Sequence, residues 1–292
     1  MSATSADTSP EELKRCCGRL YESDFAKLLL GDSFHPGGLK LTERLGSLMQ
    51  LTAGVRVLDV ACGTGASALF LARRFGCQVI GIDLSRQNVL RATEAAAAQG
   101  LSDQVKFQHS DAEQMAFSDG TFEAVICECA FCTFPDKNAA AHEFARVLCP
   151  GGRIGLSDLT RDQELVEQLK GLLAWIACIA DAQPVQAYVE CLRSAGFDRY
   201  EVEPHHEALI EMADQIRGKL LGAEILVGLK KLSLPGVNFV TAKELLKVAL
   251  ETIHDGRLGY TIIIASRPQL HGDEAASSRG DDARTIDTPR RR

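Results

Sequence analysis

The chain alternates short apolar runs with longer stretches in which apolar residues recur about every 3.6 positions. Short uninterrupted apolar runs are typical of strands buried on both faces, and the longer pattern is typical of amphipathic helices. The expected strands cover residues 55–60, 78–83, 105–108, 122–128, 153–157, 197–204 and 260–266. The expected helices cover residues 11–30 (one or two helices), 40–50, 66–75, 86–99, 137–148, 163–180, 186–195, 209–231 and 242–254. This alternation predicts an α/β fold with a parallel, doubly wound sheet.

Polar residues at both ends of the chain set the expected domain limits. Residues 1–10 and 269–292 are small or polar, so we expect both segments to be disordered. The remaining residues, 11–268, suit one elaborated domain. Within it we expect an N-terminal helical lid at 11–50, a nucleotide-binding core at 51–160, and substrate-side helices with the last strands at 161–268.

A glycine turn, Ala61-Cys62-Gly63-Thr64-Gly65, follows the first expected strand. Strand, turn and helix together place backbone N–H groups and a helix N-terminus at the carboxyl end of the strand, where an adenosine ligand can bind closely. The second strand ends in Asp83, where a carboxylate can accept hydrogen bonds from both ribose hydroxyls. Taken alone, this pattern also fits a nicotinamide-binding Rossmann enzyme or an α/β domain that binds no ligand.

Four ordered motifs narrow these alternatives: VLDVACGTG, GIDLS, SDAE and LCPGGRIGLSD. With them the chain resembles the class I S-adenosylmethionine (SAM)-dependent methyltransferases, from about Val55 to Asp158 and more loosely to Pro268. The resemblance implies a doubly wound, Rossmann-like, seven-stranded methyltransferase sheet with N-terminal helices and a helical insertion before the last strand. It also implies SAM as cofactor.

The same resemblance assigns a role to each residue of the expected cofactor pocket. Asp59, Gly63 and Gly65 hold the methionine end of SAM, Asp83 the ribose and Asp111 the adenine amine, while Glu128 lines the methionine side. Ala61, Leu84 and Ala112 belong to the same pocket. Ala61 stands where the family usually has its first glycine, so its methyl group crowds the turn.

Composition limits the expected partners. The net charge of −7 and a pI of about 5.6 give no basic surface for nucleic acid. The most apolar helical stretch, residues 165–182, contains Glu167 and Lys170 and is too short to cross a bilayer, and no signal peptide is evident, so we expect no membrane partner and a cytoplasmic protein. Ten cysteines in such a compartment favour reduced thiols, metal or metalloid binding, or redox catalysis over a disulfide scaffold. The oligomeric state stays open.

Cysteines gather where a doubly wound sheet binds its ligands. Cys127, Cys129 and Cys132 lie at the carboxyl end of the fourth strand, and alternation places the first two on one face if the strand continues that far. Cys178 follows the fifth strand, in a segment that often covers the substrate. Thiolates are soft ligands that suit a trivalent metalloid or Zn²⁺. Buried cysteines also often only pack in the core.

A narrower resemblance rests on ECAFCTFPDK and on WIACIADAQPVQAYVECLRSAGF, which are similar to two segments of the arsenite methyltransferases. It implies that Cys129 and Cys178 bind arsenite, with Cys132, Cys16 or Cys17 as a candidate third ligand. It further implies methyl transfer to arsenic itself, without a general base, and a thiol reductant of the thioredoxin or glutathione type. The chain departs from that family at Glu128 and Cys132, where asparagine is usual, and it lacks the usual cysteine in the loop before the first strand.

Three hypotheses therefore stand at this point. The first is methyl transfer from SAM to thiol-bound trivalent arsenic or a related metalloid. The second is methyl transfer to a small organic hydroxyl, amine or carbon, with His35 or Glu128 as base and the cysteines incidental. The third is a non-catalytic sensor that binds SAM or a metal.

Overall fold

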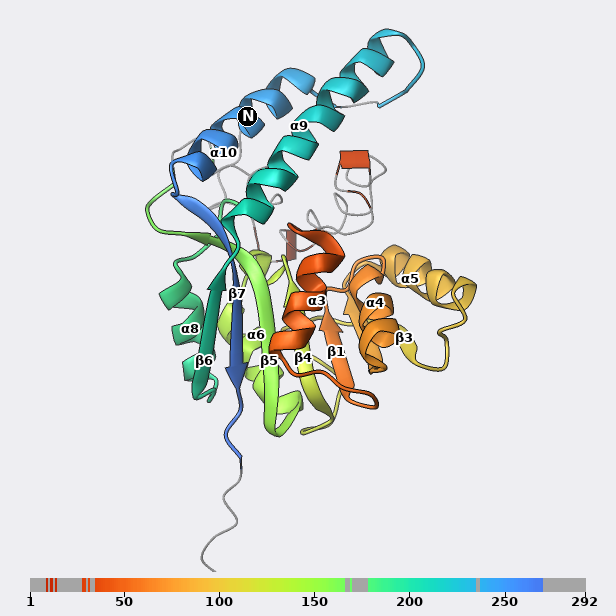
Figure 1. Cartoon of the computed structure of the whole chain (residues 1–292), viewed down its shortest axis with the longest axis vertical. Helices are drawn as coiled ribbons and strands as arrows, with labels where there is room; N and C mark the ends of the chain where they lie inside the picture. Colours follow the sequence, from red (N-terminus) through yellow and green to blue (C-terminus); the bar gives the residue numbers. More distant parts are fainter. Residues whose placement is uncertain are drawn as a thin grey trace, which may run out of the picture.

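The computed structural model describes residues 9, 11–12, 14, 28–29, 31, 35–165, 169, 178–234 and 237–269. These residues contain a seven-stranded sheet with the order β3-β2-β1-β4-β5-β7-β6 (Figure 1). The strands are β1 (Arg56–Val60), β2 (Gln78–Asp83), β3 (Val105–His109), β4 (Phe122–Glu128), β5 (Leu148–Arg161), β6 (Arg199–Pro204) and β7 (Leu258–Ser266). The chain order reverses between β1 and β4, which confirms the doubly wound topology.

Helices cover both faces of this sheet. Figure 1 shows α3 (Gly38–Leu48) and α4 (Ala66–Phe75) on one face, and α6 (Lys137–Val147) with α8 (Val185–Ser194) on the other. The remaining α-helices described are α5 (Arg86–Ala98), α9 (His206–Gly228) and α10 (Phe239–His254). Gly155 lets α3 approach β5 closely, because a Cβ there would lie 2.5 Å from the sulfur of Met49. This contact holds the C-terminal end of α3 against the sheet.

The last strand corrects the expectation of an all-parallel sheet. Strand β7 runs antiparallel to both of its neighbours, β5 and β6. Two helices, α9 and α10, connect β6 to β7, and they pack against each other as a hairpin (Figure 1). A hairpin returns the chain to the end of the sheet from which it left. Strand β7 therefore begins where the other strands end, which the alternation of strands and helices does not reveal.

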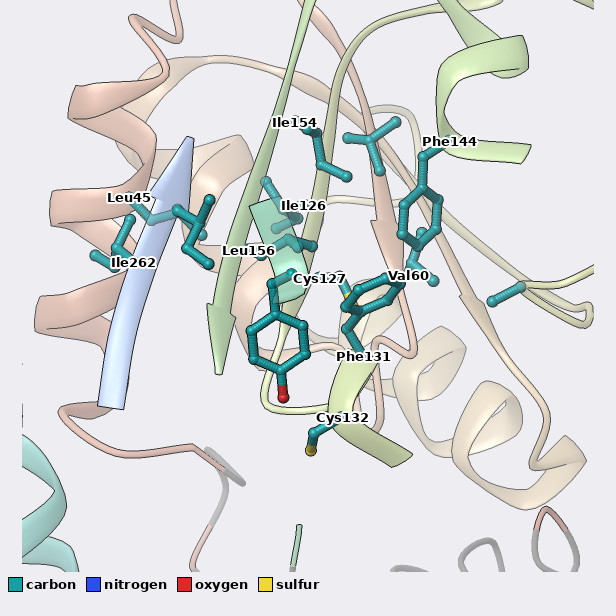
Figure 2. Close-up of a cluster of buried hydrophobic side chains, with 14 of the residues drawn as sticks. Leu45, Val60, Ile126, Cys127, Phe131, Cys132, Phe144, Ile154, Leu156 and Ile262 are labelled. Carbon is teal, nitrogen blue, oxygen red and sulfur yellow. The ribbon is translucent and has the colours of Figure 1, made fainter. Parts of the chain in front are cut away.

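The core follows the apolar runs of the sequence. Every residue of β7 except Ser266 is buried, as are the central residues of β1 and β4. Figure 2 shows how Val60, Ile126 and Leu156 from three neighbouring strands pack with Phe131 and Phe144. Cys127 and Cys132 are fully buried within this cluster. These side chains give the carboxyl ends of β4 and β5 a rigid apolar support.

The sequence predicted most elements to within a few residues. The bounds of β2, β4 and α4 agree with the prediction, and Ser85 caps α5 by accepting the N–H of Asn88 at 2.9 Å. The prediction was wrong for β5, which extends to both sides of 153–157. Most of the helix expected at 163–180 lies outside the described residues, as do residues 1–8 and 270–292 of the two terminal segments. Among the described residues, no helix has the length and apolar character needed to cross a membrane.

Candidate active site

A cavity of about 1140 Å³, which includes the open space at its mouth, lies at the carboxyl ends of β1, β2, β3 and β4. This is where a doubly wound sheet binds its ligands. The structure brings together in its lining ten residues that the sequence singled out: His35, Asp59, Ala61, Gly63, Asp83, Leu84, Asp111, Ala112, Glu128 and Cys129. Gly65 is not part of the lining. Its φ of 85° and a phenyl carbon of Phe107, which would lie 2.6 Å from an added Cβ, give it a structural role in the turn.

The glycine turn is held by backbone contacts. The N–H of Gly63 donates to the carboxylate of Asp83 at 2.9 Å, and the N–H of Cys62 donates to the carbonyl of Ile82 at 2.9 Å. Ala61 has a φ of 58°, in the left-handed region that a Cβ disfavours. The sequence therefore indicated correctly that alanine crowds this turn, and the structure shows the cost as backbone strain.

Replacing Ala61 by Gly should raise the free energy of unfolding by up to about 1 kcal/mol, because release of the left-handed strain exceeds the entropy cost of glycine. Urea denaturation would measure this change. Ala53→Gly is the control. Ala53 lies in an exposed turn and its φ is not positive, so glycine at this position should lower the free energy of unfolding of the enzyme. If Ala61→Gly and Ala53→Gly destabilised the enzyme equally, the backbone at Ala61 would not be strained.

Asp59 is a buried carboxyl group in an unusual environment. Its side chain is 2% exposed, and its Oδ2 has no hydrogen-bond partner among the described residues. Burial, followed by the negative charges of Glu128 and Asp83, raises the pKa of Asp59 well above its usual range. A buried carboxylate oxygen that lines a cavity without a partner is poised to bind a cationic group.

A second acidic group lies further along the cavity. Asp111 accepts the N–H of Glu113 at 2.9 Å and the Nζ of Lys14 at 2.7 Å. Lys14 also donates to Glu113 at 2.6 Å and lines the cavity with both acids. The sequence did not indicate this ion pair, because the partners lie almost a hundred residues apart and no local pattern connects them. Lys14 therefore contacts the carboxylate that the family resemblance assigns to adenine.

Glu128 and His35 meet at the inner end of the cavity. The carboxylate of Glu128 accepts hydrogen bonds from Ser67 Oγ at 2.6 Å and from Thr42 Oγ1 at 3.0 Å, and it lies 3.6 Å from His35 Nε2. The four side chains come from the loop before α3, from α3, from α4 and from the end of β4. Sequence reasoning named His35 and Glu128 as alternative bases, but it missed Thr42 and Ser67 and the contact between the two.

Hydrogen bonds assign the proton on His35. Its Nδ1 lies 3.1 Å from the carbonyl oxygen of Pro36, which can only accept, so Nδ1 carries the hydrogen in the neutral ring. The lone pair is then on Nε2, beside Thr42 Oγ1 at 3.3 Å. His35 is buried at 6% exposure and lines the cavity. Its Nε2, the nitrogen that can accept a proton, therefore lies beside the carboxylate of Glu128.

Three thiols meet beside the same end of the cavity. The sulfur of Cys178 lies within hydrogen-bonding reach of the sulfurs of Cys129 and Cys132, and 3.3 Å from the carbonyl oxygen of Cys129. The backbone N–H of Cys132 donates to Asp158 at 2.9 Å. Strand β4 ends at Glu128, so the condition for a shared face of Cys127 and Cys129 is not met: Cys127 is buried in the core, and Cys129 lines the cavity. Cys16 and Cys17 lie outside the described residues.

Backbone strain and burial distinguish these thiols. Cys129 and Cys178 have φ values of 53° and 63°, and left-handed residues other than glycine often mark functional sites. Contact with Cys178, and then burial, raises the pKa of the Cys129 thiol well above its usual range, and burial followed by the same contact raises that of Cys132. Among the described residues, no group of three or more His, Cys, Asp or Glu side chains is arranged to hold a metal ion.

Comparison with known proteins identifies the cavity's cofactor class. Residues 57–152 match the family described as "Methyltransferase domain". The chain is 31% identical to the O-methyltransferase cnsE of Penicillium expansum, over 86% of this chain and 91% of that protein. It is 29% identical to the 27-O-demethylrifamycin SV methyltransferase of Amycolatopsis mediterranei, over 78% and 83% of the two chains. A shorter match, at 30% identity and over 59% of this chain, spans 63% of the methyltransferase GfsG of Streptomyces halstedii.

A solved structure supports the same fold. Phosphoethanolamine N-methyltransferase 2 of Haemonchus contortus, in complex with SAM, superposes with a TM-score of 0.74 at 22% identity, over 88% of this chain and 60% of that chain. Three of these proteins are named for methylation of oxygen or nitrogen, GfsG is named only as a methyltransferase, and none of the four is named as an arsenite methyltransferase. With a relative above 30% identity matched along most of its length, the chain belongs to the class I SAM-dependent methyltransferases and is an enzyme of that class.

Proposed function

We propose that this enzyme transfers the methyl group of SAM to a small organic acceptor, in the first place a hydroxyl. The observation that carries the proposal is His35, buried in the cavity wall with Nε2 3.6 Å from the carboxylate of Glu128. A hydroxyl is a poor nucleophile until its proton is removed, and a histidine with a carboxylate beside its free nitrogen can remove that proton. The relatives cnsE and the rifamycin methyltransferase are named for oxygen methylation, which agrees with this choice.

The lining residues fit SAM by their chemistry. SAM carries an ammonium group, two ribose hydroxyls and an adenine amine, and supplies an electrophilic methyl group. The unpartnered Oδ2 of Asp59 suits the ammonium group, and Asp83 at the end of β2 suits the hydroxyls. Leu84 is 40% exposed within the cavity and offers an apolar surface for the adenine ring, next to Ala112 and Asp111. SAM binding then places Asp111 between Lys14 and the adenine amine.

His35 and Glu128 share the work of proton removal. The Nε2 lone pair of His35 accepts the acceptor's proton, and the carboxylate of Glu128 stabilises the imidazolium that results. Ser67 and Thr42 hold that carboxylate in place by hydrogen bonds. Burial of both groups excludes water, which strengthens their interaction with the developing charge.

The first test is an assay of S-adenosylhomocysteine release. The purified enzyme is incubated with SAM and, separately, with phenols, aliphatic alcohols and primary and secondary amines, and the products are identified by mass spectrometry. We expect methylated hydroxyl compounds, with phenols ahead of alcohols because their protons are more acidic. Release without acceptor sets the background. SAM binding in the absence of a methylated product from any acceptor would contradict the proposal.

The thiol cluster favours a second candidate, trivalent arsenic. Cys129, Cys132 and Cys178 are in contact, two of them with strained backbones, beside the methyl side of the cavity. Arsenous acid exchanges three hydroxyl groups for three thiols, and each thiol proton leaves with a hydroxide as water, so the raised pKa values do not forbid binding. Methyl transfer from SAM oxidises arsenic from the trivalent to the pentavalent state. A thioredoxin- or glutathione-type reductant then supplies the electrons that return it to the trivalent state.

Arsenic speciation separates this candidate from the first. The enzyme is incubated with SAM, arsenite and a thiol reductant, and products are separated by chromatography with elemental detection. If arsenic is a substrate, Cys129→Ser and Cys178→Ser should each abolish methylated arsenic, whereas Cys149→Ser, a change at a half-buried thiol beside Glu123, should not. Absence of methylated arsenic from the unmodified enzyme would exclude this candidate and leave the organic acceptor.

A further inference from the structure

The α9–α10 hairpin carries an exposed apolar cluster. Among the described residues, ten large hydrophobic side chains are exposed, and five of them lie between residues 221 and 240. They are Leu221, Ile225, Leu226, Leu229 and Val240, with exposures from 42% to 62%. The first, second and fourth recur at intervals of four along α9 and its end, so they form one stripe. We call these five residues, together with Lys230 and Lys231, the hairpin tip.

Basic residues gather towards the far end of the hairpin. Residues 217–247 contain six Lys or Arg and two Asp or Glu, a net charge of +4, whereas the whole hairpin, residues 206–254, holds six of each and is neutral. Lys243 pairs with Glu224 at 2.8 Å, but no ion pair of Lys230 or Lys231 is present in the described part of the chain. The tip therefore combines exposed apolar side chains with two lysines that lack a carboxylate partner.

The tip stands at the end of a projecting element. Figure 1 shows α9 and α10 extending away from the sheet, beyond the end at which β1, β4 and β5 finish. Close to the sheet, α9 reaches the loop that carries His35: a Cβ on Gly37 would lie 3.4 Å from the Cβ of Ala208. The hairpin is thus attached beside the active site, and its apolar end points away from it.

We propose that the hairpin tip binds an anionic phospholipid surface. Apolar side chains flanked by lysines are the composition of interfacial membrane anchors, in which the apolar groups enter the headgroup boundary and the ammonium groups meet anionic lipids. An open hollow at the tip, lined by Val227, Lys230, Lys231, Leu232 and Ser233, offers ammonium and hydroxyl donors to a headgroup phosphate. A second copy of the chain fits less well, because two tips would bring four lysines together.

This contact is peripheral and does not depend on which acceptor the enzyme methylates. It departs from the expectation of no membrane partner, which rested on the lack of a bilayer-spanning helix and of a signal peptide in the sequence.

Vesicle sedimentation tests the proposal with the full-length enzyme. We expect it to sediment with vesicles of phosphatidylcholine and phosphatidylserine, and about tenfold less with vesicles of phosphatidylcholine alone or at high salt. Ile225→Ser with Leu229→Ser should abolish binding by removing apolar contact, and Lys230→Gln with Lys231→Gln should weaken it about tenfold by removing charge. Leu90→Ser and the pair Arg73→Gln with Lys106→Gln are matched controls at exposed positions outside the hairpin, and should bind like the unmodified enzyme.

Three outcomes would overturn the proposal. The first is that the enzyme does not sediment with anionic vesicles. The second is that the tip variants bind these vesicles as well as the control variants do. Light scattering could instead show a dimer that the tip variants dissociate, which would assign the tip to a second copy. We would measure the SAM affinity and the thermal unfolding of every variant in parallel. These measurements verify that each variant is folded, so that a loss of vesicle binding is not caused by misfolding.

Discussion

Replacing Asp59 by Asn should weaken SAM binding about 100-fold, which is the usual cost of losing one partner of a buried charge pair. The same change should make the unliganded enzyme more stable at neutral pH. Both effects have one cause: Asp59 is buried, its Oδ2 has no partner among the described residues, and Glu128 and Asp83 repel its charge. In the proposed binding mode the ammonium group of SAM relieves this cost, whereas the unliganded enzyme bears it. Calorimetric titration with SAM and thermal unfolding without it would measure the two effects.

The pH dependence of stability gives an independent reading. Because burial raises the pKa of Asp59, the folded state keeps a proton that the unfolded chain releases above about pH 4. Stability should therefore fall as the pH rises from about 4 through the folded pKa, and Asp59→Asn should remove part of that fall. Asp158, whose pKa burial raises to about 7, contributes a similar loss between about pH 4 and 7, so the variant's profile should be flatter but not flat.

Asp103→Asn is the matched control, because Asp103 is exposed in the turn before β3. It should leave SAM affinity, stability and the pH profile unchanged. Equal stabilisation by both variants would mean that the gain reflects net charge and not the buried site. An unchanged SAM affinity in Asp59→Asn would place the ammonium group elsewhere.

Local order in the chain explains why the cofactor pocket could be predicted. In a doubly wound sheet the ends of successive strands meet at one edge, so an acid or a glycine at a strand end is placed by its position in the sequence. Asp59, Asp83 and Asp111 each follow this rule, and all three line the cavity. The fold was predictable for the same reason, except that β7 depends on two helices returning the chain.

The acceptor side could not be predicted in the same way. His35, Thr42, Ser67 and Glu128 come from four elements, and only packing of α3 and α4 on the sheet brings them together. The left-handed conformation of Cys129 turns its side chain away from the face that strand alternation assigns to it. The sequence named His35 and Glu128 as alternative bases, but no local pattern indicated that the two side chains lie 3.6 Å apart.

Replacing His35 by Gln should lower kcat for a hydroxyl acceptor by about 10²–10⁴-fold, the usual contribution of a general base, and leave SAM affinity unchanged. Glu128→Gln, which keeps an oxygen for Ser67 and Thr42 but lacks the charge, should cause a smaller loss. A series of phenols distinguishes a base from a structural role. A nitrophenol that is already ionised needs no base, so its rate should fall least in His35→Gln. His142→Gln, at an exposed position on α6, should behave like the unmodified enzyme. A uniform loss across the phenols would contradict proton removal by His35.

The same variant also decides between the two candidate acceptors, because they differ in whether a proton must leave. Trivalent arsenic attacks with its own lone pair, so its methylation should survive His35→Gln and disappear in Cys129→Ser. A hydroxyl acceptor requires the base and no sulfur ligand, so its methylation should show the opposite pattern. His35 and the thiol cluster lie at the same cavity, so both variants can be assayed with both acceptors. The acceptor whose methylation is lost in one variant and kept in the other is identified by its chemistry. Loss of both activities in both variants would instead mean that the loop of His35 and the thiol cluster support each other's structure.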